Sequence, residues 1–557
     1  MTSNILREII HGRLPWDELR SVPRQAAEDR RAGDEAVAVL EKVLDEHLDV
    51  AALESGGRMS DDLVRGLVDA GFLAMSLPRE DGGLGLSDYS AFRVYEAAAH
   101  RSPAVGMLLS AHNSMGPATY LRALPEGPLR DLLAKHLAAG SLSSIASTEP
   151  EGAANADRSA TARRTEDGTG YLLNGEKVFI SNGPLARLVA VTATVEDSDG
   201  QVGLFFVEVP APGFEVLAEH EYMGLRGAPS AHLRMTDVFV PVGHTVAAHA
   251  EWRTASPFAE LHTLARIYLI SAPSTAIARR SLDWSRSFVA GRRVDGRSLA
   301  EYEAVQRMIA ASAADVFAMD SAVRRALIGT EATESQWERD ALKNITTLAG
   351  WRVADRAVSL MGAQGIETAR SKAARGVAAY PAEQAQRDLR GLRIGGGVDF
   401  NLDRVLAARM LATYYRGAPK AQPGAERTAS DALGTGALSE ANRGCLTALV
   451  EDVRRLGDIC ADLTGSTPAP ELLARQETLI AVNRIVTELF TMAVVLARAA
   501  WSGDDEPQAQ DLATVYCHGS RRRLTSLWEQ VSQQLPDAYR RLSQAWTSGE
   551  PTGLLHP

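Results

Sequence analysis

The chain has 557 residues, of which 45% are hydrophobic, and it carries a formal net charge of −11 at pH 7. Because a single hydrophobic core rarely grows beyond about 300 residues, this length predicts three or four domains. The acidic charge disfavours nucleic acid as a partner, since phosphate backbones repel it. The best basic cluster is short and consists of Arg521, Arg522, Arg523, Arg540 and Arg541.

Membrane and metal signals are missing from the sequence. No run of eighteen uncharged apolar residues occurs, and residues 1–19 are interrupted by charges and a proline, so we expect neither a transmembrane span nor a secretion signal. Cys445, Cys460 and Cys517 show no Cys-x-x-Cys spacing and have no histidine cluster nearby. We therefore predict no metal site, and a reduced cytoplasm is the simplest setting.

The periodicity of apolar residues changes along the chain. Helical spacing dominates residues 25–135, with a glycine-rich loop at 78–86. Short β-rich runs follow between 144 and 246, separated by acidic turns that contain glycine, and they predict an antiparallel sheet or barrel. Helical spacing returns from Pro257 to about Tyr415.

Residues 417–439 are rich in Gly, Pro, Ala and Ser, which is typical of a linker, and they separate a fourth unit from the rest of the chain. Helical patterning then resumes, and residues 479–494 form an unusually apolar helix. Polar interruptions by Asn483, Arg484 and Glu488 favour a buried central helix over a membrane span.

The predicted fold is mainly α with a central β-barrel domain. Its expected parts are an N-terminal helical domain (1–143), a middle β-barrel domain (144–248), a helical bundle (249–416), a linker (417–439) and a C-terminal helical extension (440–557).

Four motifs in the β-rich region occur in a fixed order over about a hundred residues. They span Ser147–Gly152, Asn174–Asn182, Met223–Ser230 and Val238–Pro241. In sequence and spacing they resemble the acyl-CoA dehydrogenase family. Further likenesses are found around Arg292, at residues 362–365, at residues 387–390 and in the helical extension, and the extension makes the very-long-chain branch the closest match.

The resemblance implies a cofactor, an assembly and a set of site residues. The cofactor would be FAD, with its pyrophosphate shared between subunits, so a homo-oligomer, either dimer or tetramer, is expected. Residues of the β-domain would meet the flavin ring, and residues of the bundle would reach the pyrophosphate of a neighbouring subunit. The cofactor-binding residues implied are Ser147, Thr148, Phe179, Ile180, Ser181, Arg292, Gly362 and Gly365.

The sequence departs from the family at the catalytic base. The family abstracts the substrate's α-proton with a glutamate, but the matching position here is Gly396, which cannot accept a proton. Some relatives instead carry the glutamate directly before a retained arginine. The resemblance identifies that arginine as Arg266 and implies that it binds substrate, but the residue before it is Ala265 and not a glutamate. Glu260 and His262 precede it and are the candidates for a replacement base.

The leading functional prediction is a flavin-dependent oxidoreductase acting on an acyl thioester, carried either by CoA or by an acyl-carrier protein. One alternative is a flavin monooxygenase-like relative, because a pocket without the base could activate oxygen instead. Another is a catalytically inactive family member that serves as a partner subunit or binding module. A DNA-associated role of the extension and its peripheral contact with a membrane are also left open.

Overall fold

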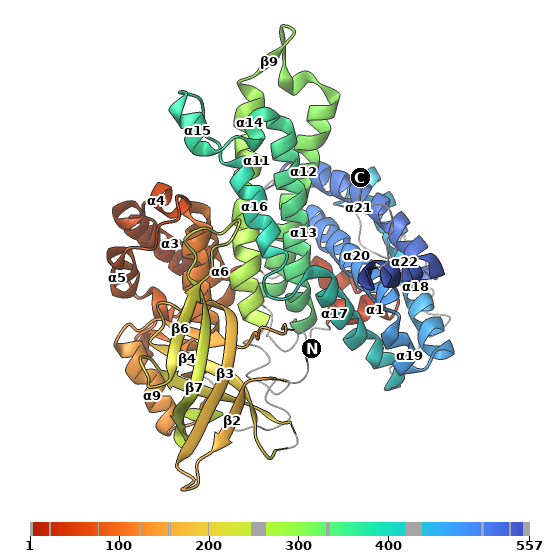
Figure 1. The fold of residues 1–557 in the computed structure, drawn as a ribbon. Helices are drawn as coiled ribbons and strands as arrows, with labels where there is room; N and C mark the ends of the chain where they lie inside the picture. Colours follow the sequence, from red (N-terminus) through yellow and green to blue (C-terminus); the bar gives the residue numbers. More distant parts are fainter. Residues whose placement is uncertain are drawn as a thin grey trace.

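The structure is a computed structural model, and it describes residues 4–21, 24–75, 77–121, 124–153, 155, 158–198, 200–246, 263–329, 335–417, 437–502, 506–533 and 536–549. A central helical bundle stands between an N-terminal helical part with the β-sheet below it and the C-terminal extension on the other side (Figure 1). Most of the predicted linker, residues 418–436, lies outside the described residues.

The N-terminal part is helical, as predicted. Its helices are α1 (Ile5–Ile10), α2 (Trp16–Arg20), α3 (Ala27–His47), α4 (Val50–Glu54), α5 (Asp61–Asp69), α6 (Asp88–Arg101), α7 (Pro103–Met115), α8 (Pro117–Leu121) and α9 (Pro128–Ala138). Serine caps start two of them: Ser60 accepts from the amide of Leu63 and Ser87 from that of Ser90, which satisfies helix N–H groups that have no partner within the helix.

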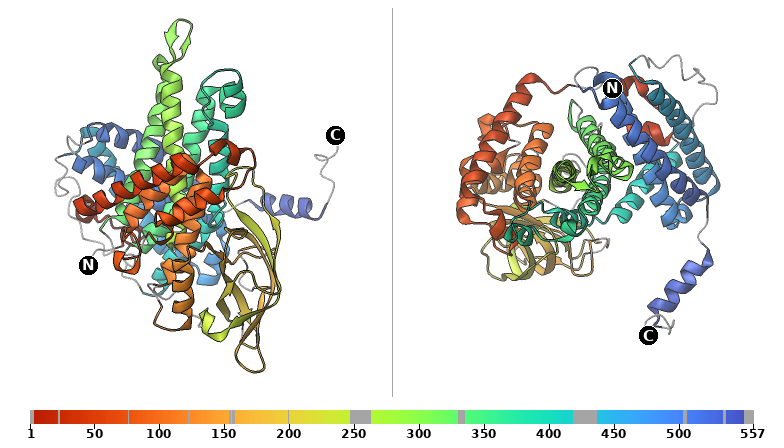
Figure 2. Two further views of the ribbon diagram at one scale, coloured as in Figure 1. Left: turned by 90° about the vertical axis from the view of Figure 1, so that its left-hand side faces the viewer. Right: turned by 90° about the horizontal axis from the view of Figure 1, so that it is seen from above.

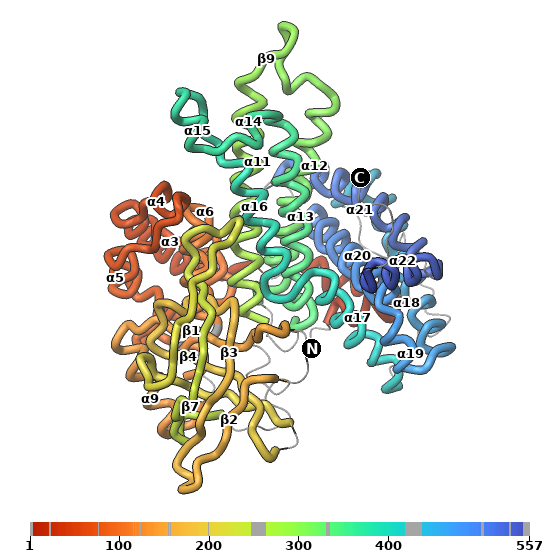
Figure 3. Tube along the Cα trace, viewed as in Figure 1, coloured from red at the N-terminus to blue at the C-terminus, as the bar shows by residue number. Residues whose placement is uncertain are grey.

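The β-region forms one sheet of eight strands. They are β1 (Ser143–Ala146), β2 (Thr161–Arg164), β3 (Gly170–Ser181), β4 (Leu188–Val195), β5 (Val202–Glu208), β6 (Phe214–Glu219), β7 (Ser230–Pro241) and β8 (Thr245–Val246). The strand order is β6-β7-β3-β2-β4-β5-β8, and β1 pairs with β4 beside this path. Figure 3 shows β1 and β4 next to each other.

The prediction of a closed barrel was therefore wrong. In the described residues the edge strands β6 and β8 do not pair, and the sheet stays open. It is also mixed, because β1 and β2 both run parallel to β4. Alternation in the sequence reveals strands, but closure depends on strand tilt and stagger around the whole sheet, which alternation does not encode.

The bundle combines long helices with a short hairpin at its tip. Its elements are α11 (Ala272–Ala290), β9 (Arg293–Val294), β10 (Arg297–Ser298), α12 (Glu303–Leu327), α13 (Gln336–Met361), α14 (Ala363–Ile366), α15 (Ala369–Ala374), α16 (Ala382–Leu392) and α17 (Asp399–Tyr415). A π-helical turn, Ile267–Ser271, precedes α11. Helix α13 lies at the centre, and it buries charged as well as apolar side chains. Its polar residues need partners inside the protein, and these partners organise the site described below.

The extension consists of α18 (Glu440–Ser466), α19 (Ala469–Ala474), α20 (Gln476–Ser502), α21 (Ala509–Ser532) and α22 (Asp537–Thr547). Helix α20 is long and apolar enough to cross a membrane, but 83% of its most apolar window is buried inside the protein. It contacts α12, α17, α18 and α21, and both α1 and α2 pack on it. This confirms the expected buried central helix. Helix α22 projects from the body (Figure 2).

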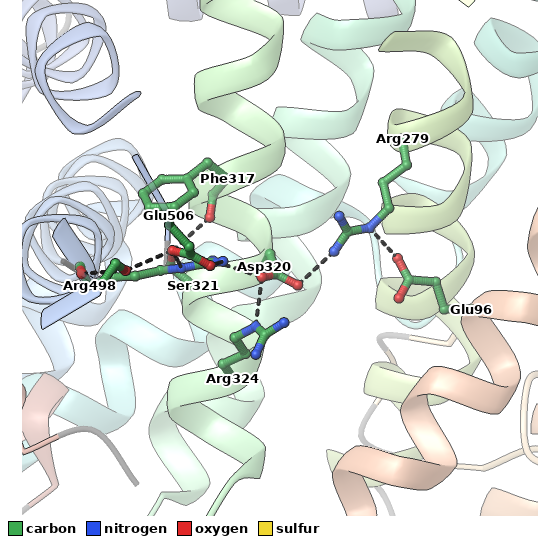
Figure 4. Close-up of polar contacts among 9 residues, drawn as sticks. Glu96, Arg279, Phe317, Asp320, Ser321, Arg324, Arg498 and Glu506 are labelled. Carbon is green, nitrogen blue, oxygen red and sulfur yellow. Dashed lines mark hydrogen bonds and ion pairs between the residues drawn. The ribbon is translucent and has the colours of Figure 1, made fainter. Parts of the chain in front are cut away.

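A network of ion pairs joins the extension to the rest of the chain (Figure 4). Asp320 of α12 accepts from Arg279 of α11 at 2.6 Å and from Arg498 of α20 at 2.7 Å. Arg279 also pairs with Glu96 of α6 at 2.7 Å. Burial opposes ionisation of Asp320, but the surrounding guanidinium groups hold its pKa well below the usual range. The Asp320 carboxylate thus links the bundle to the extension, and Glu96 links the N-terminal part to the same network through Arg279.

Glu338 of α13 fixes the start of the chain to the bundle. One carboxyl oxygen accepts from the backbone amide of Leu6 and the other from the side chain of Asn4, both at 3.0 Å. The side chain is 3% exposed, and burial raises the pKa of Glu338 to about 7. In the unfolded chain this carboxyl titrates near 4.5, so the folded state binds the proton more tightly than the unfolded state.

We expect Glu338→Gln to stabilise the protein at pH 8 but not at pH 4. The folded state gives up about 3 kcal/mol of stability as pH rises from the unfolded pKa through the folded pKa. A neutral amide avoids this loss, but its NH2 group cannot accept one of the two hydrogen bonds, which costs about 1 kcal/mol. Denaturant unfolding of both proteins across this pH range measures it. Glu28→Gln, at an exposed site of α3, is the control and should show no such pH dependence. Equal curves for wild type and Glu338→Gln would contradict the prediction.

Candidate functional site

A buried ion pair anchors the loop that carries Ser147 and Thr148. The Lys177 ammonium of β3 lies 2.6 Å from the Glu149 carboxylate, and the two side chains are 0% and 2% exposed. Glu149 also accepts from the backbone amides of Ser159 and Ala160. The ammonium holds the pKa of Glu149 below its usual value against the effect of burial. The loop is therefore fixed beside β3.

Phe179 stands on an irregularity of β3 directly after this anchor. The pairing of β3 with β7 shifts register between Lys177 and Ile180, and Phe179 has a positive φ of 58°. Its backbone amide donates to Nε2 of His220 at 3.1 Å, and the two rings lie 4.8 Å apart. The Phe179 side chain is nevertheless 58% exposed. A strained bulge that presents an apolar ring to solvent is typical of a ligand-contacting position.

Residues with hydroxyl groups lie close to Phe179 along the backbone of the sheet. The amide of Val178 donates to the carbonyl of Thr148 at 2.9 Å, which places Thr148 next to β3. Ser147 accepts a hydrogen bond from Thr192 at 3.3 Å, and Ser181 pairs with Ser230 across β3 and β7. The structure thus brings the predicted residues Ser147, Thr148, Phe179 and Ser181 onto the same part of the sheet.

The predicted residue Ile180 points the other way. Its side chain is 2% exposed and belongs to the hydrophobic core of the sheet. Successive side chains on a strand alternate between faces, so an exposed Phe179 goes with a buried Ile180. Only the backbone of Ile180 is available for contact with a ligand in this conformation.

The remaining predicted cofactor residues lie at the opposite end of the molecule. Arg292 is exposed directly before β9, Gly362 is the residue directly before α14, and Gly365 lies within α14. In both side views β9 and α14 stand at the top of the bundle, whereas β3 lies low in the sheet (Figures 1 and 2). Gly362 has a φ of 57° and faces open space, whereas a Cβ at Gly365 would lie 2.3 Å from the carbonyl oxygen of Val358. Packing within the chain therefore already requires glycine at 365.

Gly396 lies in the loop between α16 and α17, opposite the π-helical turn. Its φ is +68°, and a Cβ there would lie 3.3 Å from Cγ1 of Ile270 and 3.5 Å from Cγ of Arg266. Nε of Arg266 donates to the carbonyl oxygen of Gly396 at 3.1 Å. A side chain at position 396 would thus point at Arg266. No carboxylate is among the atoms nearest to this point.

Lys343 of α13 fixes the shape of this glycine loop. Its ammonium donates to the carbonyl oxygens of Arg393 and Gly397, both at 2.7 Å, although the side chain is fully buried. Burial lowers the pKa of Lys343 to about 8, opposed by the nearby carboxylates of Asp399 and Asp403. A buried amine bonded to two carbonyls makes the loop a rigid part of the bundle.

Arg266 is itself held by a buried carboxylate. Asp340 accepts from Arg266 at 3.1 Å and from Arg409 at 3.2 Å, and its side chain is 2% exposed. Because both oxygens of Asp340 are paired with guanidinium groups, Asp340 positions Arg266 and is poorly suited to accept a proton from the substrate. The candidate bases Glu260 and His262 fall in residues 247–262, outside the described residues.

Several residues of this region were not singled out from the sequence. His220 carries no motif signal: it directly follows β6, and it reaches Phe179 because β6 pairs with β7 and β7 pairs with β3. Asp340 and Lys343 could have been found from the sequence, because α13 has apolar residues on all sides and some of its charged residues must therefore be buried. In the part of the chain that the structure describes, no group of three or more His, Cys, Asp or Glu side chains could hold a metal ion.

Comparison with protein-family models gives three matches in order. Residues 26–126 match the N-terminal domain of acyl-CoA dehydrogenases, residues 144–238 the middle domain and residues 263–411 the C-terminal domain. Together these matches cover well over half of the chain, and they include the loop of Ser147, strand β3 and the glycine loop at 396.

Individual proteins are similar over most of the chain. Probable acyl-CoA dehydrogenase FadE10 of Mycobacterium tuberculosis is 27% identical over 582 residues, which covers 98% of this chain and 89% of the relative. Benzylmalonyl-CoA dehydrogenase of Aromatoleum aromaticum is 26% identical over 365 residues, 64% of this chain and 91% of the relative.

Among solved structures, an acyl-CoA dehydrogenase complexed with FAD from Bacillus anthracis superimposes with a TM-score of 0.76. It is 20% identical, and the match covers 98% of this chain and 95% of that one, so the shared fold includes the C-terminal extension. The three domain matches, read together with this fold, show that the chain belongs to the acyl-CoA dehydrogenase family of flavin-dependent oxidoreductases.

Proposed function

We propose that this protein is an FAD-dependent oxidoreductase acting on an acyl thioester, with a proton acceptor other than residue 396. The observation that supports flavin binding is the exposed ring of Phe179 on a fixed bulge of β3, with the backbone of Thr148 bonded to Val178 and Ser181 two residues further along the strand. The names of the relatives support an acyl-CoA substrate. A substrate on an acyl-carrier protein remains an alternative form of the same thioester.

The residues present fit a flavin ring. Phe179 offers an apolar face, and the Ser147, Thr148 and Ser181 hydroxyls offer donors for the ring edge, where negative charge accumulates on reduction. Bound here, FAD supplies the hydride acceptor of the reaction. The anchor of Glu149 and Lys177 keeps these groups in place without rearrangement when the ring binds.

The α-proton of the substrate needs a different acceptor. Gly396 offers no side chain, and Asp340 is occupied by two arginines. Arg266, 29% exposed and directed at the Gly396 carbonyl, is a donor that can orient a polar group of the substrate. Glu260 and His262 stay the predicted candidates, because they precede Arg266 by one to two helical turns in the sequence.

The test is the visible spectrum of the purified protein, repeated anaerobically with acyl-CoAs of different chain lengths. Bleaching of the flavin bands by substrate alone supports the proposal. Bands that persist with every acyl-CoA, but bleach with a separate reductant and then drive oxygen uptake, would favour the monooxygenase-like alternative. A protein that is colourless and cannot be reconstituted with FAD would overturn the enzyme assignment and favour a partner subunit.

The replacement base is tested in the same assay. Removing the group that takes the proton, by Glu260→Gln or by His262→Asn, should slow anaerobic bleaching by about 100-fold or more. The reason is that a general base usually raises the reaction rate by a factor of about 10²–10⁴. FAD content of each variant should stay at the wild-type level. Bleaching at wild-type rates in both variants would exclude both residues.

A homo-oligomer completes the proposed FAD site. Arg292 and the α14 region lie far from β3 within one chain, so one flavin can meet both only if a second copy contributes the arginine. We propose at least a dimer in which Arg292 reaches the pyrophosphate of the neighbouring subunit, where its planar donor fork suits the anion.

Arg292→Ala is expected to weaken FAD binding by about tenfold or more, since a charge-assisted hydrogen bond is worth about 1.5–3 kcal/mol. Flavin fluorescence titration measures this affinity, and light scattering reports the assembly state. Arg286→Ala is the matched control, because Arg286 is also an exposed arginine of this region and pairs only locally with Asp283. Equal FAD affinity in both variants would contradict the role of Arg292.

A further inference from the structure

Two cysteines of the extension face each other across α18 and α21. Cys445 lies on α18 and is half-buried, and Cys517 lies on α21 and is buried. Helices α18 and α21 pack against each other, and each thiol influences the ionisation of the other. They are 72 residues apart in sequence and share no motif, so only the packing of the two helices brings them together.

The register of the two helices independently places these cysteines opposite each other. One turn before them, the Thr514 hydroxyl of α21 donates to the Asn442 side chain of α18 at 3.0 Å. Beyond them, Arg521 of α21 pairs with Asp452 of α18 at 3.2 Å. The helices therefore run in the same direction with fixed side-chain pairs on both sides of the thiols. A disulfide here needs the sulfur atoms to close to about 2.05 Å between helices already held in register.

The two thiols differ in character. The hydrogen bond from Cys517, assisted by the charge of Arg521, lowers the pKa of Cys445 to about 7, whereas the pKa of Cys517 is raised well above its usual value. Cys445 is thus the group that ionises, and it is also the more exposed of the two. A larger share of Cys445 than of an ordinary cysteine is therefore thiolate near neutral pH.

We propose that Cys445 and Cys517 form a redox-active pair that hydrogen peroxide converts to a disulfide linking α18 to α21. The Cys445 thiolate attacks one peroxide oxygen, the O–O bond breaks, and a sulfenic acid and one water form once a proton is taken up. The Cys517 sulfur then attacks the Cys445 sulfur, the S–O bond breaks and a second water leaves. Two thiols lose two electrons and two protons, and one peroxide becomes two waters.

The third cysteine provides an internal control. Cys460 lies on the same helix as Cys445 but is fully buried, and burial raises the pKa of its thiol far above the usual value. It faces neither of the other two sulfurs closely enough to share a hydrogen bond with them among the described contacts. Peroxide should leave it as a thiol.

The experiment treats the full-length protein with hydrogen peroxide, alkylates the remaining thiols under denaturing conditions and maps the peptides by mass spectrometry. We expect two of the three thiols to disappear, a Cys445–Cys517 cross-linked peptide, and full recovery with dithiothreitol. Cys460→Ser should behave like the wild type. Cys517→Ser should accumulate a sulfenic acid at Cys445 that dimedone traps, and Cys445→Ser should leave Cys517 unmodified.

Two results would overturn the proposal. One is three alkylatable thiols in the wild type after exposure to peroxide. The other is oxidation of Cys445 beyond the sulfenic acid with no cross-linked peptide, which would mean that Cys517 does not reach it. Both results are measured on the wild-type protein, so a folding defect in a variant changes neither of them.

Discussion

In a protein that already carries Glu260→Gln and His262→Asn, adding Gly396→Glu should raise the rate at which acyl-CoA bleaches the flavin by a factor of about 10²–10⁴, the usual contribution of a general base. The new side chain would start between Ile270 and Arg266, with its Cβ 3.5 Å from Arg266 Cγ, at the position where the sequence resemblance predicts the base. The guanidinium of Arg266 would favour the ionised, proton-accepting form of the new carboxyl. Anaerobic stopped-flow absorbance with a series of acyl-CoAs measures the rate.

The same substitution carries a structural cost that a control must separate. A φ of +68° suits glycine and costs another residue about 1–2 kcal/mol, and the Cβ would lie only 3.3 Å from Ile270. Gly396→Gln introduces the same strain and bulk without a base. We therefore expect both variants to lose a similar amount of thermal stability and only the glutamate to gain rate. Equal rates in the two variants would show that the missing carboxylate does not limit the reaction.

Lys177→Met should cost about 3–5 kcal/mol of folding stability and lower the affinity for FAD. The substitution leaves the Glu149 carboxylate buried without its cation, which is among the most destabilising changes a core can undergo. Because Glu149 directly follows Thr148 in the chain, loss of the anchor also frees the loop beside Phe179. Denaturant unfolding and a flavin titration measure the two effects.

An exposed ion pair of the same length is the matched control. Lys135 and Glu208 also lie 2.6 Å apart, but their side chains are 67% and 42% exposed, so Lys135→Met should change stability by less than about 1 kcal/mol. The double variant Glu149→Gln with Lys177→Met removes the unpaired charge and should recover more than half of the loss. A cost at Lys177 no larger than that at Lys135 would show that the buried pair does not anchor the loop.

Much of the fold was predictable because periodicity records which faces are buried. The helices of residues 25–135, the strands of the middle region and the apolar helix α20 all follow from this pattern. Barrel closure was predicted wrongly, because pairing at the sheet edges depends on geometry that no local pattern encodes. For the site, motifs located Thr148 and Phe179, but the motif also included Ile180, whose side chain the strand turns into the core.

The sequence by itself determined the family, the order of its parts and the absence of a carboxylate at Gly396, because these depend on residue identity and spacing along the chain. Tertiary structure alone decided what surrounds those residues. It placed Lys343 under the glycine loop, set Asp340 between two arginines, and brought Cys445 to Cys517 across 72 residues. Such contacts arise from how helices pack, and packing joins residues whose separation in sequence carries no signal.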